Sequence, residues 1–364
     1  MLSRYFDERG VLQLDIPGGG RTPRVFSEPQ REHLATRRDA GLFDFSFMNC
    51  WEIAGRDSVR FLQNLQTRDM RSLKPGRICY TLLCRSDGSV MNDATVWRHG
   101  PERFWLFSGR RSDRSHITAY ARGYDVAISE ISDSQAVIAI QGPRSHALLA
   151  RLLTSYSLAG LPYFSFEKTH LCNRVAWIGR LGYSGELGYE VIVPAEAAME
   201  VWERIRAEGR SHGAVECGFD AANSLRIESG YILFSQELKE PTTPYELGLS
   251  RLVALQRGAF IGADALRTLN RSLPRRNLVG LKLEPIASVV PDARYIAAAR
   301  FTSECFSPTF GRDLALGFVD WANRSPDRIV YARDGRRGRI VRLPFYDPAR
   351  VVPRRLRLTQ FLAN

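Results

Sequence analysis

The sequence has 364 residues, of which 44% are apolar and 25% charged, and it carries a formal net charge of +12. This length exceeds what one hydrophobic core usually serves, and the composition excludes a largely disordered chain, so we expect two or three packed units. The first residues are already charged (Arg4, Asp7, Glu8), and no stretch approaches the roughly 20 apolar residues of a membrane span. We therefore expect neither export nor a membrane span, and a soluble protein of the cytoplasm.

Cysteine, histidine and arginine usage excludes several classes of site. The six cysteines and six histidines are scattered, without a Cys-x-x-Cys or His-x-x-x-His pair, which predicts reduced core thiols and no metal site. The arginines are spread along the chain, and where they are densest, at 333–342 and 350–357, they alternate with apolar residues. Because no nucleic-acid-binding motif accompanies them, we expect a solvated basic surface suited to acidic small molecules or an acidic partner, and no nucleic acid.

The N-terminal part of the chain predicts an α+β unit with an antiparallel meander. A turn cluster at 17–23 precedes a helical stretch at 30–39, and a second helix begins at Asp57 or Ser58, where an N-capping side chain meets apolar residues at helical spacing. Short apolar runs with strand character lie at 50–53, 79–84, 90–97 and 103–108. The turn at 86–89 indicates a hairpin between two of these runs.

The rest of the chain predicts a second α+β unit and then a small all-β module. A strand at 137–140 leads into a helix, and strands at 175–178 and 188–193 lead into a helix that runs from about residue 195 to Gly209. Sheet and helix can then bury each other's apolar faces. After a polar break at 274–276 the strands are short and no long helical pattern follows, which is typical of a small β-module.

Short motifs recur in a fixed order over almost the whole chain. They are FDFSFM at 43–48, DGSVMND at 87–93, GYSGELGYE at 182–190, RIESGY at 226–231, TPYELGL at 243–249 and FSPTFG at 306–311. Each alone is a weak signal, whereas their order, spacing and span are specific. Together they resemble the T-protein (aminomethyltransferase) family of the glycine cleavage system.

The resemblance implies an α+β fold of three lobes around a central cavity that binds tetrahydrofolate. Two lobes would be ferredoxin-like, antiparallel α+β units that bind the folate. The first would consist of residues 1–50 and 137–270, and the second of residues 51–136. Residues 275–364 would form a C-terminal β-barrel.

Two carboxylates match the family's binding and catalytic positions. Glu190 matches the pterin-binding glutamate, and a carboxylate can accept paired, charge-assisted hydrogen bonds from the N–H edge of a reduced pterin. A solvent-facing strand glutamate is the ordinary alternative, but Glu190 follows a tight glycine turn. Asp93 matches the catalytic aspartate, and within an apolar strand it should be partnered or have a raised pKa. Because side chains alternate along a strand, either Asn92 or Asp93 faces inward. The resemblance selects Asp93, and it implies that this carboxylate accepts a proton and contacts the cofactor.

Further residues are expected around the ligand. Tyr80, Tyr183 and Tyr231 would contact the pterin and its aminobenzoyl group, with ordinary core packing as the alternative, and Met48 would also contact the cofactor. Arg226 suits an interlobe salt bridge as well as it suits ligand contact. The donor side of the cavity is assigned to Phe47, Asn49, Trp97 and Ser108.

Departures from the T-protein pattern change the expected donor. Where the family reads Asp-Val-Ser-His-Met-Gly, this chain has Phe45, Phe47 and Asn49 in place of Val, His and Gly. Asn92-Asp93 and an aromatic strand that ends at Ser108 are similar to the demethylase branch, which moves methyl groups to tetrahydrofolate. We therefore predict a tetrahydrofolate-dependent methyltransferase or demethylase that acts on a small-molecule donor.

Two alternatives stay open. One is an aminomethyltransferase of a glycine-cleavage-type system, for which an acidic carrier protein is the expected partner. The other is a non-catalytic, folate-binding assembly factor. That reading is disfavoured because such relatives carry a cysteine in the stretch that corresponds to residues 228–237, where this chain has none.

Overall fold

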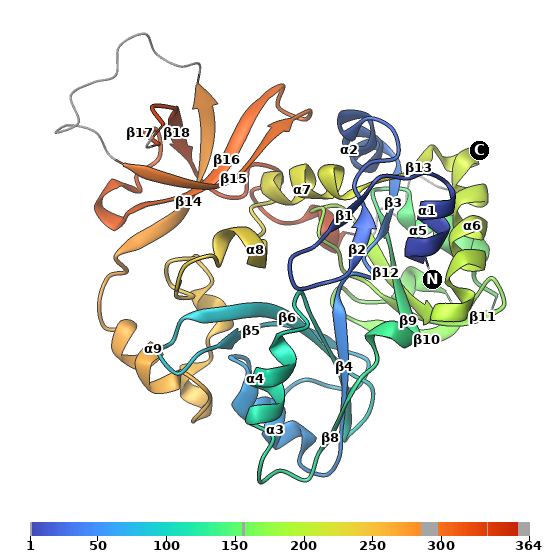
Figure 1. Ribbon diagram of the computed structural model, residues 1–364, viewed down its shortest axis with the longest axis horizontal. Coiled ribbons are helices and arrows are strands. Elements are labelled where there is room, and N and C mark those ends of the chain that lie inside the picture. Colours follow the sequence, from blue (N-terminus) through green and yellow to red (C-terminus); the bar gives the residue numbers. More distant parts are fainter. Residues whose placement is uncertain (1, 155–156, 285–297, 333, 356–364) are drawn as a thin grey trace.

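The computed structural model describes residues 2–154, 157–284, 298–332 and 334–355. Three sheets of five or six strands dominate the protein, and the third, drawn in orange, lies at one side of the two mixed α+β parts (Figure 1). The predicted mixed α+β class with several sheets is confirmed. Among the described helices none combines the length and the apolar character that crossing a bilayer demands.

The first sheet is antiparallel except for one parallel pair at its edge. The strand order is β10-β11-β12-β9-β3-β13, and β13 runs parallel to β3. The strands are β3 Ala40–Asp44, β9 Gln135–Gln141, β10 Phe166–Leu171, β11 Arg174–Gly179, β12 Gly188–Pro194 and β13 Ala214–Glu216. The strands predicted at 175–178 and 188–193 correspond to β11 and β12, which pair antiparallel as a hairpin.

Three helices cover this sheet: α1 (Leu2–Glu8), α5 (Ser145–Leu152) and α6 (Ala198–Gly209) (Figure 1). The predicted helix near residue 195 corresponds to α6, preceded by one 3-10 turn. It packs on the sheet because its apolar residues recur at helical spacing on one face. The buried residues of that face are Ala198, Val201, Trp202 and Ile205.

The second sheet is fully antiparallel, in the order β5-β6-β7-β4-β8. Its strands are β4 Asn49–Ala54, β5 Ile78–Cys84, β6 Val90–Arg98, β7 Arg103–Ser108 and β8 Ala127–Glu130. One face is covered by α3 (Ser58–Leu65) and α4 (Asp113–Ala119), and the other faces the interior of the molecule. The predicted meander and hairpin are thus confirmed.

Alternation along β6 assigns its side chains to these two faces. Ala94 and Val96 are buried in the apolar cluster that includes the α3 residue Phe61. Trp97 belongs instead to the cluster on the interior side. Because successive side chains of a strand point to opposite faces, Asn92 shares the helix-covered face and Asp93 the interior face.

The third sheet has the order β15-β16-β14-β18-β17 and is antiparallel. Its strands are β14 Arg276–Glu284, β15 Ala299–Ser307, β16 Arg312–Asp320, β17 Ile329–Tyr331 and β18 Arg337–Val341. A single bridge between Ala298 and Tyr331 brings the two edge strands together, as expected for a barrel-like module. Residues 285–297, 333 and 356–364 of the predicted C-terminal module lie outside the described residues.

The remaining elements connect the sheets. They are β1 Gln13–Asp15, β2 Arg21–Pro23, α2 Pro29–Arg38, α7 Phe219–Glu228, α8 Phe234–Glu237 and α9 Ala263–Leu269. The segment that leads to α9 was predicted to belong to the first lobe, but its backbone bonds to residues next to the second sheet. Ala254 donates its N–H to the Thr67 carbonyl at 3.0 Å, and Ile261 donates its N–H to the Asn64 carbonyl at 3.0 Å. The division of the chain into three lobes at the stated boundaries stays a prediction.

A buried ionic network around Glu228 joins helices and sheets. The carboxylate is 0% exposed and lies 3.1 Å from His33 Nε2 and 2.7 Å from Arg37 Nη2, both on α2. From the β15–β16 connection it accepts hydrogen bonds from Ser307 at 2.5 Å and Thr309 at 3.0 Å. Burial alone would raise the pKa of Glu228, but the hydrogen bond from His33 and the charge of Arg37 outweigh it and hold the pKa at about 2.

Removing the Glu228 carboxylate should destabilise the protein strongly. We expect Glu228→Ala to lower the free energy of unfolding by about 3–5 kcal/mol, because Arg37 would be left as a buried charge without this partner. Chemical denaturation measures the change. The control is Glu8→Ala, which removes the surface pair with Arg4 and should change stability by less than about 1 kcal/mol. Equal effects of the two substitutions would contradict a central role for this network.

Candidate active site

A cavity of about 750 Å³ lies where the sheets meet, and its wall draws on distant parts of the chain. The second sheet contributes Tyr80 and Asp93, and the first contributes Glu190. The segment after β18 contributes Arg350 and Arg354.

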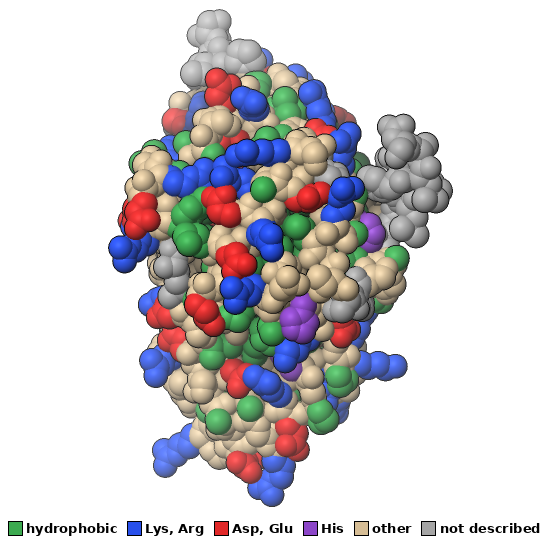
Figure 2. All heavy atoms as spheres, turned by 90° about the vertical axis from the view of Figure 1, so that its right-hand side faces the viewer, with side chains coloured by type: hydrophobic (Ala, Val, Ile, Leu, Met, Phe, Trp, Pro, Cys, Tyr) green, Lys and Arg blue, Asp and Glu red, His purple; other side chains and the backbone are tan. Residues whose placement is uncertain are grey.

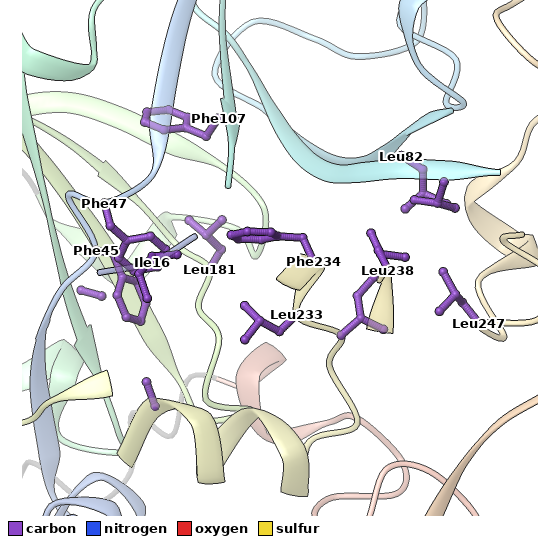
Figure 3. Packing of buried hydrophobic residues seen from close by; sticks show 14 of the residues in the cluster. Ile16, Phe45, Phe47, Leu82, Phe107, Leu181, Leu233, Phe234, Leu238 and Leu247 are labelled. Atoms are coloured by element: carbon purple, nitrogen blue, oxygen red, sulfur yellow. The ribbon is translucent and has the colours of Figure 1, made fainter. Parts of the chain in front are cut away.

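One wall is apolar and largely aromatic. Figure 3 shows Phe45 and Phe47 beside each other, with Leu181 and Phe234 facing them and Phe107 of β7 above. Phe47 meets Phe45 and Phe219 edge-on, with ring centroids 5.8 Å apart in each pair. The rings therefore support one another as a fixed wall that excludes water from one side of the cavity.

Asp93 enters the cavity from β6 with one hydrogen-bond partner. Tyr80, on the neighbouring strand β5, donates its hydroxyl to Asp93 Oδ2 at 3.0 Å. Burial raises the pKa of Asp93 to about 6, although the Tyr80 hydrogen bond lowers it, and the nearby Asp113 carboxylate adds to the increase. Among the described residues no other side chain donates to this carboxylate, so it can take up a proton near neutral pH.

Glu190 is the second buried carboxylate of the cavity, and it is only 8% exposed. On β12 it lies opposite Ala139 of β9 and Gly179 of β11, neither of which carries a polar side chain. Within the part of the chain that the structure describes, no group donates a hydrogen bond to it. Burial raises the pKa of Glu190 to about 7. A ligand with adjacent N–H donors would supply the missing bonds.

Aromatic hydroxyls line the space near the two carboxylates. Tyr183 and Tyr231 are stacked, with centroids 5.9 Å apart and an interplanar angle of 23°. Tyr183 donates its hydroxyl to the Ile232 carbonyl at 2.5 Å, which fixes its ring. The flat faces of these rings suit a planar, aromatic ligand.

The part of the wall beside Tyr80 and Tyr231 is strongly basic. Lys74, Arg251, Arg350 and Arg354 line the cavity, and none of them is paired with a carboxylate of the described residues. Burial lowers the pKa of Arg251, and the charges of Arg350 and Arg354 lower it further, which shows that like charges are held close together. Such an arrangement suits an anionic group of a ligand.

Arg180 holds this basic segment in place. Its guanidinium is 3% exposed and donates to the carbonyls of Pro353 at 3.4 Å and Arg354 at 2.9 Å. A third hydrogen bond, to the Leu161 carbonyl at 3.0 Å, anchors the guanidinium to the segment between α5 and β10. The position of Arg354 in the cavity wall therefore depends on a buried cation without a carboxylate partner among the described residues.

Most residues predicted for the site reach the cavity. Lining residues are Phe47, Met48, Tyr80, Asp93, Ser108, Tyr183, Glu190 and Tyr231. Arg226 does not line it: its guanidinium is bonded to Glu237 at 3.1 Å and to Ser303 at 2.6 Å, so it ties α7 to α8 and β15. The salt bridge to Glu237 lies within the stretch predicted as the first lobe, and only the hydrogen bond to Ser303 reaches the predicted C-terminal module.

Three of the four donor-side residues have other surroundings than predicted. Trp97 is fully buried and packs on Phe107 and Phe166, and its ring fills the space above Gly179, where a Cβ would meet it at 2.2 Å. Asn49 is paired with Ser108 across β4 and β7, on the helix-covered face of the sheet. The Ser108 hydroxyl donates a hydrogen bond to Asp113 at 2.5 Å on that face. Ser108 therefore reaches the cavity at the end of β7, but its hydroxyl is directed to Asp113.

Several wall residues have no local signal in the sequence. Phe107 and Phe234 read as ordinary core residues, and Arg350 and Arg354 as part of a basic surface. Asp113 starts a short helix and is 2% exposed, beside the site but outside the cavity wall. Within the described ranges, no three His, Cys, Asp or Glu side chains are grouped closely enough to hold a metal ion.

Comparison with known proteins agrees with this geometry. The GCVT N-terminal domain family matches residues 2–257. The aminomethyltransferase of Bacillus subtilis (strain 168) is 33% identical over 94% of this chain and 97% of its own length. The chain belongs to the aminomethyltransferase (T-protein) family. A second relative, the aminomethyltransferase of Desulfitobacterium hafniense (strain DSM 10664 / DCB-2), is 35% identical over 85% of this chain and 86% of its own.

A solved T-protein structure has the same overall fold. The crystal structure of glycine cleavage system aminomethyltransferase T from Bartonella henselae superposes with a TM-score of 0.82 at 26% identity, covering 94% of this chain and 96% of that one. The predicted family and the predicted enzyme class, a one-carbon group transferase, are confirmed. The predicted methyltransferase or demethylase activity agrees less well with these relatives than the alternative prediction, an aminomethyltransferase, does.

The unsatisfied Glu190 carboxylate should weaken the ligand-free protein in a pH-dependent way. The pKa of Glu190 is raised from 4.5 to about 7, so the protein loses stability as the pH rises from 4.5 through 7. Glu190→Gln removes the charge, and we expect it to stabilise the ligand-free protein by about 1–3 kcal/mol at pH 8. At pH 5 the gain should nearly vanish.

Urea denaturation at both pH values measures this effect. The matched control is Glu167→Gln, because Glu167 is an exposed glutamate on β10 of the same sheet. It should give the same stability as the parent at both pH values. A Glu190→Gln variant that is less stable than the parent at pH 8 would show that the carboxylate has a donor in the ligand-free protein.

Proposed function

We propose that this protein is a tetrahydrofolate-dependent aminomethyltransferase, with the folate in the central cavity. The observation that carries the proposal is Glu190, a carboxylate buried in the cavity wall without a described donor. A reduced pterin offers the paired N–H groups that would satisfy it. The membership of the family supports the same assignment.

The three parts of tetrahydrofolate find three chemically different parts of the wall. Glu190 would bind the pterin edge, and the stacked pair Tyr183 and Tyr231 would pack on the planar rings. The glutamate tail carries carboxylates, and the unpaired cations Arg350 and Arg354 suit them. The residues present therefore fit the ligand along its whole length.

Asp93 is the proposed catalytic residue. Tetrahydrofolate supplies the nitrogens that accept the one-carbon unit, one in the reduced pterin ring and one in the link to the aminobenzoyl group. With a pKa of about 6, Asp93 is mostly ionised at pH 7 to 8 and can accept a proton or stabilise positive charge beside it. Tyr80 holds Oδ2 of the carboxylate, so the other oxygen is the one available to the reacting groups.

The one-carbon donor is proposed to be an aminomethyl group on a carrier protein of the H-protein type. The net charge of +12 and the basic part of the cavity wall suit an acidic carrier. On the face shown in Figure 2, Lys and Arg side chains are interspersed with Asp and Glu, so the basic excess is not gathered there. The cytoplasm stays the predicted location.

A panel of donors tests the proposed function. The protein is incubated with tetrahydrofolate and either aminomethyl-loaded H-protein or small methyl donors of the sulfonium and aryl ether classes. We expect methylenetetrahydrofolate and ammonia from the aminomethyl donor, detected by mass spectrometry, and no methyltetrahydrofolate. A methyl product from a methyl donor would restore the demethylase prediction, and folate binding without any product would favour the assembly-factor alternative.

Asp93→Asn should abolish most of the turnover without removing the folate. General acid–base assistance contributes roughly 10²–10⁴-fold, so kcat should fall by about that factor, while the tetrahydrofolate Kd stays within about threefold of the parent. Steady-state kinetics and calorimetry measure the two quantities.

Tyr80→Phe provides the comparison. The Tyr80 hydrogen bond lowers the pKa of Asp93, so its loss should raise that pKa and move the acidic limb of the kcat–pH profile to higher pH, with turnover retained above it. If Asp93→Asn leaves kcat within about threefold of the parent, far short of that contribution, the catalytic group is another one.

A further inference from the structure

Behind Asp93, on the helix-covered face of the second sheet, lies a small buried polar cluster. It consists of Asn92, Ser108 and Asp113, with exposures of 0%, 3% and 2%. Asp113 Oδ2 accepts hydrogen bonds from Asn92 Nδ2 at 2.5 Å and from the Ser108 hydroxyl at 2.5 Å. One carboxylate oxygen on α4 thus binds both β6 and β7, the strands that meet beside the cavity.

The Asn92 side chain carries this contact through to the backbone of Asp93. Its Oδ1 accepts the Asp93 N–H at 2.9 Å, while its Nδ2 donates to Asp113. A backbone N–H can only donate and a carboxylate oxygen accepts, so the amide has a single orientation that satisfies both ends. A continuous chain of hydrogen bonds therefore runs from Asp113 through Asn92 to the residue after it.

We propose that Asp113 is a positioning residue for Asp93, acting from the opposite face of the sheet through the Asn92 amide. The inference rests on the proposed function, in which Asp93 performs the proton transfer. Asp113 touches neither the cavity nor the substrate, because it does not line the cavity wall. Its role is to fix the backbone that aims the Asp93 carboxylate.

The negative charge of Asp113 has a second effect, on the pKa of Asp93, which can be measured separately from the positioning of its backbone. The titratable groups that interact with Asp93 are Tyr80 on β5, Arg110 before α4, Tyr183 and, from the other face of the sheet, Asp113 on α4. Burial raises the pKa of Asp93, the Tyr80 hydrogen bond and Arg110 lower it, and Asp113 raises it. Arg85 and Arg110 face Asp113 itself. Removing the Asp113 charge should therefore lower the pKa of Asp93.

A purely structural role for Asp113 predicts different results. Burial raises the pKa of Asp113, so the fold already disfavours its charge, and the isosteric Asp113→Asn should be tolerated in stability. If Asp113 only stabilised the sheet, this variant would change the melting temperature and leave kcat and its pH profile unchanged. If Asp113 positions Asp93, the kinetic parameters change while folding persists.

The first experiment compares Asp113→Asn with the parent and with Asp264→Asn. Asp264 is an exposed acid in the first turn of α9, so it controls for the loss of a negative charge at a helix start. We expect Asp113→Asn to lower kcat about tenfold, to keep the tetrahydrofolate Kd within about twofold, and to move the acidic limb of the profile to lower pH. Asp264→Asn should match the parent. An unchanged kcat and limb in Asp113→Asn would overturn the proposal.

The second experiment tests whether Asp113 acts through Asn92. Asp113→Asn keeps an acceptor oxygen and removes only the charge that strengthens the hydrogen bonds, whereas Asn92→Ala breaks the chain and keeps the carboxylate. For Asn92→Ala we therefore expect the loss in kcat without the shift of the acidic limb. In the Asn92→Ala background, Asp113→Asn should then lower kcat by less than about twofold, because the two residues act as one unit. Full additivity of the two losses would overturn the relay. If Asp113→Asn does not fold, the kcat of Asn92→Ala decides alone, and a value within about twofold of the parent would overturn the proposal.

A ligand-free measurement separates this inference from the proposed function. The Asp93 carboxyl is titrated by NMR in protein with ¹³C-labelled aspartate, its signal assigned by its absence in Asp93→Asn. We expect a lower pKa of Asp93 in Asp113→Asn than in the parent, whatever the donor panel shows. A protein that transfers no one-carbon unit but shows this shift would contradict the proposed function alone. An unchanged pKa would contradict the coupling between the two carboxylates.

Discussion

The carboxylate of Glu228 is the contact on which the arrangement of the sheets depends. It binds two cationic or polar groups of α2 and two hydroxyls of the β15–β16 connection, and it is shielded from water. Arg37 extends the network, because its guanidinium stacks on Tyr346 with 3.8 Å to the ring centroid. None of these residues lines the cavity, so the network joins α2 and α7 to the third sheet from outside the site.

The cavity combines features that oppose each other in a folded protein. Glu190 and Asp93 are carboxylates with raised pKa values, and Arg350 and Arg354 are cations without described carboxylate partners. A stable core would pair these opposite charges with each other. Because they are kept apart, each group stays available to a ligand. The ligand-free protein is less stable for this reason, and ligand binding would recover that stability.

Sequence reasoning found the residues whose neighbours along the chain define their surroundings. Asp93 interrupts an apolar strand and Glu190 follows a tight glycine turn, so strand alternation and a family resemblance sufficed. The position of the Ser108 hydroxyl was missed, because it depends on the pairing of Ser108 with Ala94 across two strands, and a sequence does not give that register. Asn49 lies on the same face for the same reason.

The donor was predicted from side-chain type, and this is where the sequence was insufficient. Phe45 and Phe47 replace smaller or polar residues of the family, and an aromatic pocket suggested a methyl donor. In the structure these rings pack against each other and against Phe219 as part of a wall. Aromatic residues that satisfy one another in this way do not by themselves identify a substrate.

The place of Arg350 and Arg354 in the chain has a consequence for biosynthesis. A ribosome completes all three sheets, with Asp93 and Glu190 already in them, before it adds these two arginines. Under the proposed function, a nascent chain would have the residues for the pterin but would lack two of the cations for the glutamate tail. The folate would then not act as a template for the early sheets with its full affinity, and it would stabilise the finished protein instead.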